Sequence, residues 1–391
     1  MIARTRLAPR RFAPACLAFG WLIAATAASA MPADAAWPQF RRDAAQQGVA
    51  AAALPEKLKP VWIYRLPEGA ETTAAIADGT VFIGGLSGRF AAVDLETGQE
   101  KWTVETGEEI KSSALYREGV VYFGDEFGVL RALDAETGKE KWKFTAGSSI
   151  SSSPNWAQGS EGEGCLVFGS YDNHIYCVSP TDGAERWKVE TEGYVHGTPA
   201  VAGDIILSSG CDGFLRGVEI ASGAEASKLQ IGSYVAASPA ILGDELIVGT
   251  FDNEVVKVDL DSNKIAWRYK HPDREFPFYA SPAVTADVVV VGGRDKMIHA
   301  LETATGKARW THKMRSRIDA SPVIVGDRVI VADQTGMLQI LDLGSGEVAW
   351  EFVADDAFIG SPAVAGERLV IAAGDGTVYA FAAAPAAPPA R

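Results

Sequence analysis

Short apolar runs rich in β-branched residues recur along this chain, and turn residues bound each of them. Examples are VVYFG at 120–124 and ELIVG at 245–249. A tight turn such as Asp252-Asn253 follows, and a further apolar run comes after the turn. Runs of this length between Gly, Asp and Asn are typical of strands joined in hairpins. The pattern therefore predicts an all-β fold.

A longer period is superimposed on these runs. The phrase ALDAETGKEKW at 132–142 has near-copies at 92–102 and 177–187, and units follow one another every 40 to 45 residues. A unit without tryptophan, GVEIASGAEAS at 217–227, carries Ser227 at the end of the phrase. Tryptophan closes the phrase at the other seven positions, namely Trp62, Trp102, Trp142, Trp187, Trp267, Trp310 and Trp350. A period in this range over eight units indicates a repeat architecture.

Each unit predicts four short strands, the first of which opens on Ser-Pro-Ala-Val or a variant of it. Four strands with hairpin turns in about 40 residues are typical of a propeller blade. We therefore predict an eight-bladed β-propeller of four-stranded antiparallel blades over residues 61–382. The last unit stops before a tryptophan strand, so we expect the strand at 61–66 to complete it and close the ring.

The segments outside the repeat are expected to lie on the surface. Residues 31–60 are predicted to form an N-terminal surface segment that must reach the eighth blade, with part of residues 44–60 disordered. The Ala- and Pro-rich tail at 383–391 is also expected to be disordered.

The repeated phrase has a structural reading. Its Asp can accept hydrogen bonds from the turn, and its Gly permits a positive φ. The tryptophan then falls on the outermost strand, where its flat apolar ring can pack on the next blade while the indole N–H finds a partner. We expect the seven tryptophans to dock blade on blade, with no catalytic role.

The first 30 residues form a segment of another kind. Four arginines and no acidic residue accompany an apolar run that ends in Ala28-Ser29-Ala30, a small-x-small cleavage site. This is typical of a secretory signal peptide and too short for a stable membrane span. We expect a periplasmic or otherwise exported protein, with no transmembrane segment after cleavage. Cys16 precedes most of the apolar run, so no lipid anchor is expected.

The charge narrows the class of partner. Without residues 1–30 the chain carries 32 basic and 50 acidic residues, a formal net charge of −18. A chain this acidic offers no broad basic surface to nucleic acid or to an anionic membrane. We expect no nucleic-acid partner, and solubility alone explains the acidity.

Three cysteines remain after residue 30, and an odd number leaves at least one unpaired within the chain. A three-residue loop would pair Cys177 with Val167 and place Cys165 diagonally, about 7–8 Å away. That distance is long for an unstrained bridge. Buried thiols are favoured over a disulfide between Cys165 and Cys177, and the disulfide stays open as the alternative.

The units resemble the PQQ-type propeller repeat, whose Ala-x-Asp-x-x-Thr-Gly-x-x-x-Trp phrase is matched at 92–102, 132–142 and 300–310. WPQFRRD at 37–43 also resembles the opening of exported PQQ-repeat proteins. Part of this family is non-enzymatic, such as the BamB-like propellers of the outer-membrane β-barrel assembly machinery. That part implies an exported scaffold that binds an envelope protein or peptide, with no cofactor.

The other part of the family implies the alternative, a periplasmic quinone-dependent dehydrogenase or quinone-binding sensor that holds PQQ with Ca²⁺. Those enzymes are longer and several carry adjacent cysteines, whereas no two cysteines are adjacent here. Every unit of this chain is also short, which leaves no insertion to roof an active site. We favour the non-enzymatic reading.

A propeller places one loop residue of each blade at the mouth of its central channel. Two residues before the Ser or Thr that opens each unit, the units have the following residues, here called the mouth ring: Glu71, Lys111, Ser151, His196, Ala236, Tyr279, Asp319 and Ile359. Charged, imidazole and phenol groups are unusual at a packing position, so they suggest a small polar binding site. The alternative is that these side chains satisfy one another and trapped water.

Two further sets of residues bear on a partner-contact site and on a metal site. Phe276 and Phe278 lie in the longest inter-blade insertion, at 271–280, and suggest a loop that contacts a partner. The five histidines are spread over the chain without a metal-ligand spacing, so no metal site is expected. No catalytic motif was found, and no catalytic residue is predicted.

Overall fold

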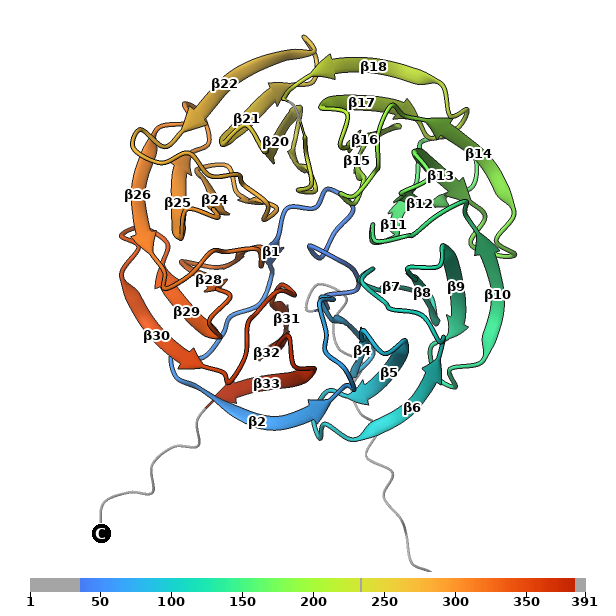
Figure 1. The fold of residues 1–391 in the computed structure, drawn as a ribbon, viewed down its shortest axis with the longest axis horizontal. Coiled ribbons are helices and arrows are strands. Elements are labelled where there is room, and N and C mark those ends of the chain that lie inside the picture. Colours follow the sequence, from blue (N-terminus) through green and yellow to red (C-terminus); the bar gives the residue numbers. More distant parts are fainter. Residues whose placement is uncertain (1–35, 233, 384–391) are drawn as a thin grey trace, which may run out of the picture. The chain divides into compact units, whose positions relative to one another are not determined.

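The computed structural model describes residues 36–232 and 234–383, and this part of the chain contains 33 strands and no helix. The strands form eight sheets around a central axis (Figure 1). The predicted eight-bladed β-propeller is therefore confirmed. The predicted signal peptide and nearly all of the predicted tail lie outside the described residues. Within the described residues, no helix is long and apolar enough to cross a membrane.

The first four blades follow one another along the chain, each built from the axis outward. Blade one contains β3 (Ala75–Ala77), β4 (Thr80–Gly84), β5 (Arg89–Asp94) and β6 (Glu100–Glu105). Blade two contains β7 (Leu115–Arg117), β8 (Val120–Gly124), β9 (Val129–Asp134) and β10 (Glu140–Thr145). Blade three contains β11 (Asn155–Ala157), β12 (Cys165–Ser170), β13 (His174–Val178) and β14 (Glu185–Glu190). Blade four contains β15 (Ala200–Ala202), β16 (Ile205–Ser209), β17 (Phe214–Glu219) and β18 (Glu225–Gln230).

The second half of the ring repeats this order. Blade five contains β19 (Ala240–Leu242), β20 (Glu245–Gly249), β21 (Glu254–Asp259) and β22 (Lys264–Lys270). Blade six contains β23 (Ala283–Val284), β24 (Val288–Gly292), β25 (Met297–Glu302) and β26 (Ala308–Lys313). Blade seven contains β27 (Val323–Val325), β28 (Arg328–Ala332), β29 (Met337–Asp342) and β30 (Val348–Val353). Blade eight contains β31 (Ala363–Ala365), β32 (Arg368–Ala372), β33 (Thr377–Ala383) and β2 (Leu58–Arg65).

Blade eight joins the two ends of the repeat. Its outermost strand β2 comes from the start of the chain and pairs antiparallel with β33, with Ile63 opposite Tyr379. This pairing was predicted for residues 61–66, and the structure confirms it with a strand that begins three residues earlier. Every blade therefore has its outer strand, and the ring is closed by pairing the two ends of the repeat.

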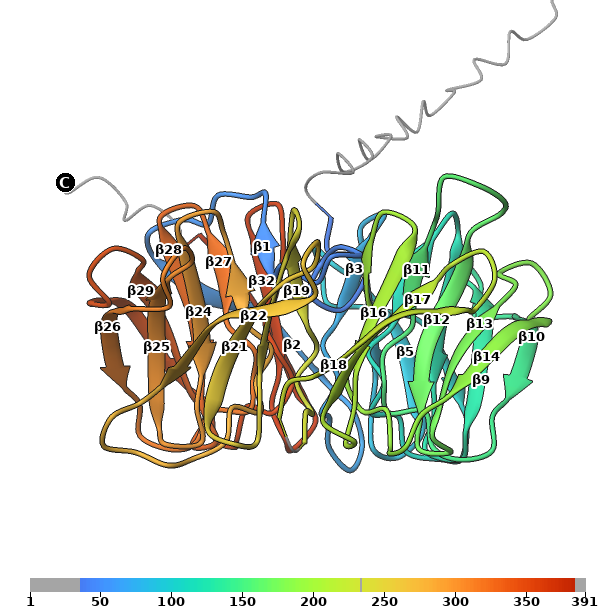
Figure 2. The ribbon, with the colours of Figure 1, turned by 90° about the horizontal axis from the view of Figure 1, so that it is seen from above.

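The hydrophobic core is divided into layers between adjacent blades. All five residues of β24 are buried, whereas half-buried and exposed residues alternate along β30. The middle strands of each blade have a neighbouring blade on both sides in the ring (Figure 1), so both of their faces are apolar. Figure 2 shows the same ring from the side. The outermost strands turn only one face inward, which explains their period of two.

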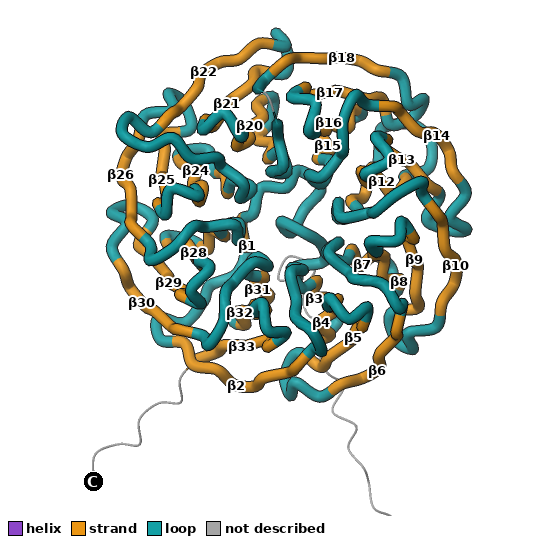
Figure 3. The backbone as a smooth tube through the Cα atoms, viewed as in Figure 1, coloured by secondary structure: helices purple, strands orange, loops and turns teal. Residues whose placement is uncertain are grey.

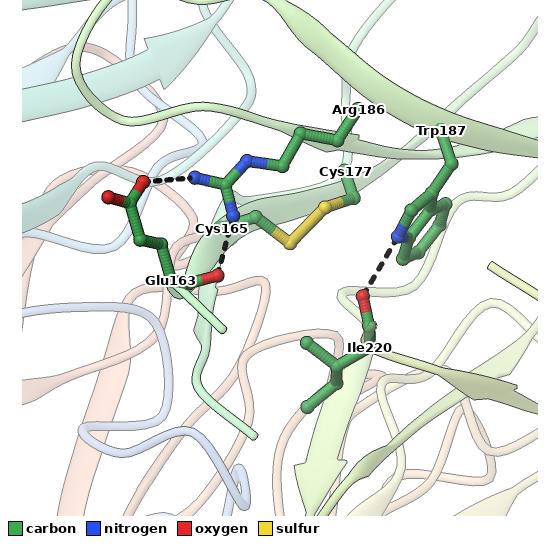
Figure 4. Close-up of a disulfide and its surroundings, with 6 residues drawn as sticks. All are labelled: Glu163, Cys165, Cys177, Arg186, Trp187 and Ile220. Atoms are coloured by element: carbon green, nitrogen blue, oxygen red, sulfur yellow. Dashed lines mark hydrogen bonds and ion pairs between the residues drawn. A yellow bond between two sulfur atoms is a disulfide. The ribbon is translucent and has the colours of Figure 1, made fainter. Parts of the chain in front are cut away.

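Each of the seven tryptophans that close the repeated phrase lies on an outermost strand and donates its indole N–H to a backbone carbonyl of the next blade, at 2.8–3.0 Å. The pairs are Trp62 with Leu95, Trp102 with Ala135, Trp142 with Pro180, Trp187 with Ile220, Trp267 with Thr303, Trp310 with Leu343, and Trp350 with Leu58. Figure 4 shows one of these bonds, from Trp187 to Ile220.

Two cysteines depart from the prediction. Cys165 and Cys177 form a disulfide that joins β12 to β13 (Figure 4), and Cys211 is the free thiol of the described residues. The expected register is present, with Val167 opposite Cys177. The preference for buried thiols was wrong, because the two Cα atoms are 5.7 Å apart. Strand twist shortens one diagonal of a ladder below its value in a flat sheet.

The amino-terminal segment, residues 37–50, also departs from the prediction. It runs into the centre of the ring (Figures 1 and 3), and Trp37 and Arg41 are fully buried. Its backbone bonds to inner strands at Ile76, Tyr116, Val201, Ile241, Val284 and Ile324. β1 (Val49–Ala50) pairs in parallel with β27. The surface path was wrong here because inner strands carry unpaired N–H groups, which this segment satisfies.

Arg41 fixes the segment to two blades. Its guanidinium donates to the carbonyl of Pro322 at 2.6 Å and to that of Pro282 at 2.8 Å. Full burial lowers the pKa of Arg41 to about 9. Gly48 leaves room for this side chain, since a Cβ there would overlap the guanidinium at a backbone φ of 67°.

Candidate functional site

The opening Ser or Thr of each unit forms a closed belt around the central channel. The backbone N–H of each of these residues donates to the hydroxyl oxygen of the next, over 2.8–3.1 Å. The Ser/Thr belt consists of Thr73, Ser113, Ser153, Thr198, Ser238, Ser281, Ser321 and Ser361. The last bond, from Ser361 to Thr73, completes the circle. The repeated Ser-Pro signal is thus a structural element of the channel wall.

The belt is the wall of a cavity of about 330 Å³, and the mouth ring surrounds it. All eight mouth-ring positions from Glu71 to Ile359 line this one cavity. The structure therefore brings together residues that the sequence aligned only by their place in the repeat.

Phe40 of the amino-terminal segment also lines the cavity. It comes from the segment that crosses the channel on the inner strands, so the cavity has an aromatic floor. Gln39 beside it donates to Asn155 Oδ1 at 2.7 Å, and Asn155 donates to the carbonyl of Ala44. These bonds fix the segment on both sides of Phe40.

Aromatic groups form one side of the mouth. His196 Nδ1 lies 2.6 Å from the Tyr171 hydroxyl, and its Nε2 lies 2.9 Å from the Tyr279 hydroxyl. Burial lowers the pKa of His196, and the charge of Lys111 lowers it further. A neutral imidazole donates from one nitrogen and accepts at the other, so one of the two phenols keeps a free O–H. Tyr194 stacks on Tyr171 with ring centres 5.0 Å apart.

Carboxylates and one ammonium form the opposite side. Lys111 Nζ lies 2.8 Å from Glu109 and 4.0 Å from Glu126, and Ser151 donates to Glu126 at 2.6 Å. Burial lowers the pKa of Lys111, but its hydrogen bond to Glu109 and the charges of nearby acids outweigh this and raise it. Burial raises the pKa of Glu71. The Lys111 ammonium opposes that shift, and the charges of Glu109, Glu126 and Asp319 add to it.

Asp319 is held by a network of its own. Arg294 donates to it from Nε at 2.7 Å and from Nη2 at 3.1 Å, and Gln334 donates to Oδ2 at 2.6 Å. The same guanidinium lies over the Tyr279 ring, 4.4 Å from its centre. A bidentate pair of this kind is rigid and largely neutralised.

Sequence reasoning missed three cavity residues, namely Phe40, Glu126 and Tyr171. Glu126 and Tyr171 hold equivalent positions in the turn between the second and third strands of their blades, two residues after Gly124 and Gly169. Arg294 and Gln334 hold the same position in later blades, so aligning this turn as well would have found all four. Phe40 lies outside the repeat, and no periodic signal points to it.

The two predicted contact aromatics are separated by the structure. Phe276 is half exposed, whereas Phe278 is only 2% exposed and packs among Val255, Val289 and Val291. Phe278 directly precedes the mouth ring, where the other blades carry buried residues such as Ile110 and Ile150. Its predicted role in partner contact was wrong, because this register points the side chain into the blade interface.

The residues of the site do not form a metal centre. Within residues 36–232 and 234–383, no group of three or more His, Cys, Asp or Glu side chains could hold a metal ion. The cavity carboxylates Glu126 and Asp319 are directed at separate partners instead of at a common point.

The fold defines an eight-bladed β-propeller with a cavity on its central axis. The chain belongs to the family described as "Beta-alanine-activating enzyme, beta-propeller", whose sequence pattern matches residues 66–383. No curated protein sequence matches it.

Solved structures show the same fold at low identity. BamB from Moraxella catarrhalis superposes with a TM-score of 0.71 at 19% identity, over 84% of this chain and 100% of that one. Quinohemoprotein alcohol dehydrogenase from Comamonas testosteroni gives 0.73 at 14% identity, over 91% of this chain and 82% of that one. A europium-containing methanol dehydrogenase gives 0.74 at 11% identity, over 90% and 98%. At these identities the likeness shows the fold alone.

Proposed function

We propose that this chain is an exported, non-enzymatic propeller scaffold that binds a protein or peptide partner in the cell envelope. The cavity-bearing face of the ring is the binding face in this proposal. The observation that carries it is a group of exposed aromatic side chains around the cavity mouth.

Four aromatic side chains form this group, here called the aromatic rim. Phe127, Tyr194, Tyr234 and Phe276 are 68%, 53%, 56% and 50% exposed. Phe127 follows cavity residue Glu126 in its hairpin turn, and the other three lie two or three residues before the mouth ring. They therefore share one end of the propeller. Exposed aromatics around a recess are typical of a protein-binding surface.

The quinone alternative finds less support in the lining of the cavity. PQQ is a tricarboxylate, so a site for it needs several cationic groups. The cavity wall has one ammonium, Lys111, and three carboxylates, Glu71, Glu126 and Asp319. The carboxylates do not converge on a point that a hard cation such as Ca²⁺ would occupy. These residues do not fit a bound quinone with its metal.

Site-directed photocrosslinking tests the proposal. A benzophenone amino acid at Phe127 or Tyr194 is expected to give discrete adducts with an envelope fraction. The same group at Ile63, which is equally exposed on outer strand β2, is expected to give none. Adducts of equal yield at Ile63, or none at any position, would refute the cavity face as the binding face.

Reconstitution with PQQ and Ca²⁺ tests the alternative independently. Quinone absorbance that stays with the protein, together with dye reduction by alcohols, would overturn the non-enzymatic reading. Export is checked by the amino terminus of the mature protein, which the proposal places after Ala30.

A further inference from the structure

We propose that the cavity receives a single basic side chain of the bound partner, a lysine or an arginine, with Glu71 as its counter-ion. The inference rests on the proposed function and adds the chemistry by which the partner is recognised. Four properties of the cavity carry it: its charge, an unpaired carboxylate, its free hydroxyl groups and its size.

The lining is net negative at neutral pH. Three carboxylates and one ammonium face the cavity, and the other ionisable groups of the lining are neutral. Burial raises the pKa of Tyr279 to about 12, so its phenol stays protonated. Burial lowers the pKa of His196, so its imidazole does not add positive charge. Asp319 is paired with Arg294, which leaves Glu71 and Glu126 against the single ammonium of Lys111, so a cation entering the cavity still meets a net attraction.

Glu71 is the carboxylate that lacks a partner. Asp319 has Arg294 and Gln334, and Glu126 has Ser151. Glu71 makes no hydrogen bond and no ion pair within 4 Å among the described side chains, and it feels Lys111 only at longer range. Lys111 lies against Glu109 instead. A half-buried carboxylate beside three other acids is costly to keep ionised, and a bound cation would remove that cost.

The Ser/Thr belt supplies hydrogen-bonding groups that the fold has not used. All eight side chains are more than nine-tenths buried, and each hydroxyl oxygen accepts one backbone N–H. None of these hydroxyls donates to a protein group within the described residues. Each keeps a lone pair and an O–H that face the cavity. An ammonium or guanidinium can therefore hydrogen-bond to the belt hydroxyls nearest to it while Glu71 balances its charge.

The size and the aromatic lining match one side chain. A volume of about 330 Å³ is at the lower end of ligand pockets, which span roughly 300–1,000 Å³. The rings of Phe40, Tyr171 and Tyr279 offer apolar and π surfaces to an alkyl stem and its cationic end. The aromatic rim outside the mouth would contact the backbone and neighbouring side chains of the same peptide.

Short synthetic peptides test the inference without knowledge of the partner. Acetylated and amidated Gly-Lys-Gly and Gly-Arg-Gly are titrated into the full mature protein by calorimetry. Matched peptides contain norleucine or acetyl-lysine at the central position. We expect binding of the lysine or arginine peptide in the millimolar range or better, and no binding of the neutral peptides. Equal binding of charged and neutral peptides, or binding of none of them, would overturn the inference.

Variants locate the site. Glu71→Gln is expected to weaken binding of the basic peptide by about tenfold or more. Glu136→Gln makes the same charge change in an exposed turn between the third and fourth strands, outside the cavity, and is expected to leave affinity unchanged. Unfolding curves of both variants show whether the fold is intact. An intact Glu71→Gln protein that binds as the wild type does would refute Glu71 as the counter-ion.

Two further arms separate the sources of the cation and the two proposals. Free hexylamine that binds as tightly as the lysine peptide would point to a small amine and overturn the partner side chain as ligand. Photocrosslinking from Phe127 is repeated in Glu71→Gln. Unchanged adducts would keep the scaffold function and refute the inference. Peptide binding that depends on Glu71, without any envelope adduct, would support the cation site in the cavity and refute the scaffold function.

Discussion

Two neighbouring blade interfaces differ in one pair of residues. Between blades three and four, Trp187 packs on Gly223, where a Cβ would approach the indole to 2.8 Å. Between blades four and five, Ser227 stands in place of the tryptophan, and Asn263 stands in place of the glycine. Asn263 keeps a positive φ of 51°, as the turn requires.

The difference separates two roles of the repeated glycine. A turn with positive φ needs Gly or Asn, and either suffices where no ring arrives from the previous blade. Only Gly suffices where an indole lies against the turn, because any Cβ would overlap it. Six turns have this contact, with Gly98, Gly138, Gly183, Gly223, Gly306 and Gly346. Tryptophan and glycine thus form one packing unit across each of these six interfaces.

Among the tryptophan substitutions, we expect the largest loss of stability at Trp62, which lies on the strand that closes the ring. Trp62 is only 8% exposed and donates to Leu95 O. Trp62→Ala is expected to lower the free energy of unfolding by about 3–5 kcal/mol, through lost burial and the cavity left behind. Urea unfolding followed by fluorescence measures this. A loss below about 1 kcal/mol would contradict the packing role assigned to the indole.

Adding a side chain at the turn glycine should destabilise an interface that contains tryptophan, such as the one between blades three and four. The interface between blades four and five, which lacks tryptophan, should tolerate either Gly or Asn at this turn. Gly223→Asn is expected to cost about 1–3 kcal/mol, because Trp187 must move. Asn263→Gly is the matched control and is expected to change stability by less than about 1 kcal/mol. Thermal unfolding of both variants checks the comparison, which fails if the two substitutions have equal effects.

Introducing tryptophan and glycine together between blades four and five should show that their effects on stability are coupled. Ser227→Trp alone is expected to destabilise, because its ring meets the Asn263 side chain. Together with Asn263→Gly it should recover at least about 1 kcal/mol relative to the sum of the single changes. A double-mutant cycle measures the coupling energy, and additive effects would show that the pair does not act as a unit.

The smallest effect is expected in the cavity, where residues are not repeated. Burial and the charges of Glu109, Glu126 and Asp319 raise the pKa of Glu71 against the pull of Lys111. The folded state therefore holds this proton more tightly, and ionisation costs stability as pH rises above the ordinary carboxyl range. Glu71→Gln should be slightly more stable than the wild type at neutral pH and equal to it near pH 4. Melting curves at both pH values check this, and a less stable variant at neutral pH would contradict it.

The sequence predicted those parts of the molecule that the repeat specifies. Spacing gave the eight blades, the closing strand and the alignment from Glu71 to Ile359, because each blade solves the same packing problem. Phe278 was predicted to contact a partner because it is aromatic and lies in a loop. Its position in the repeat is that of Ile110 and Ile150, which are buried, and this position would have predicted burial. Cys165 and Cys177 were misjudged because strand twist changes a diagonal distance that a flat ladder fixes.

The amino-terminal segment could not be predicted from the repeat because its contacts occur once. Arg41 reaches carbonyls of Pro282 and Pro322, which lie far away in sequence. Phe40 forms a cavity floor for which no other unit supplies an equivalent. The position of a non-periodic segment depends on contacts with many blades, and these contacts exist only once the ring has assembled.

The same segment has a consequence for the order of folding. Residues 37–50 are made before any of the blades, yet their backbone partners extend from Ile76 in blade one to Ile324 in blade seven. β2 likewise waits for β33 at the opposite end of the chain. Contacts of such large sequence separation form slowly, and a partial chain leaves its edges open to other chains. This segment is therefore among the last parts of the propeller to reach its final position, and the unfinished ring is prone to pair with other chains until it does.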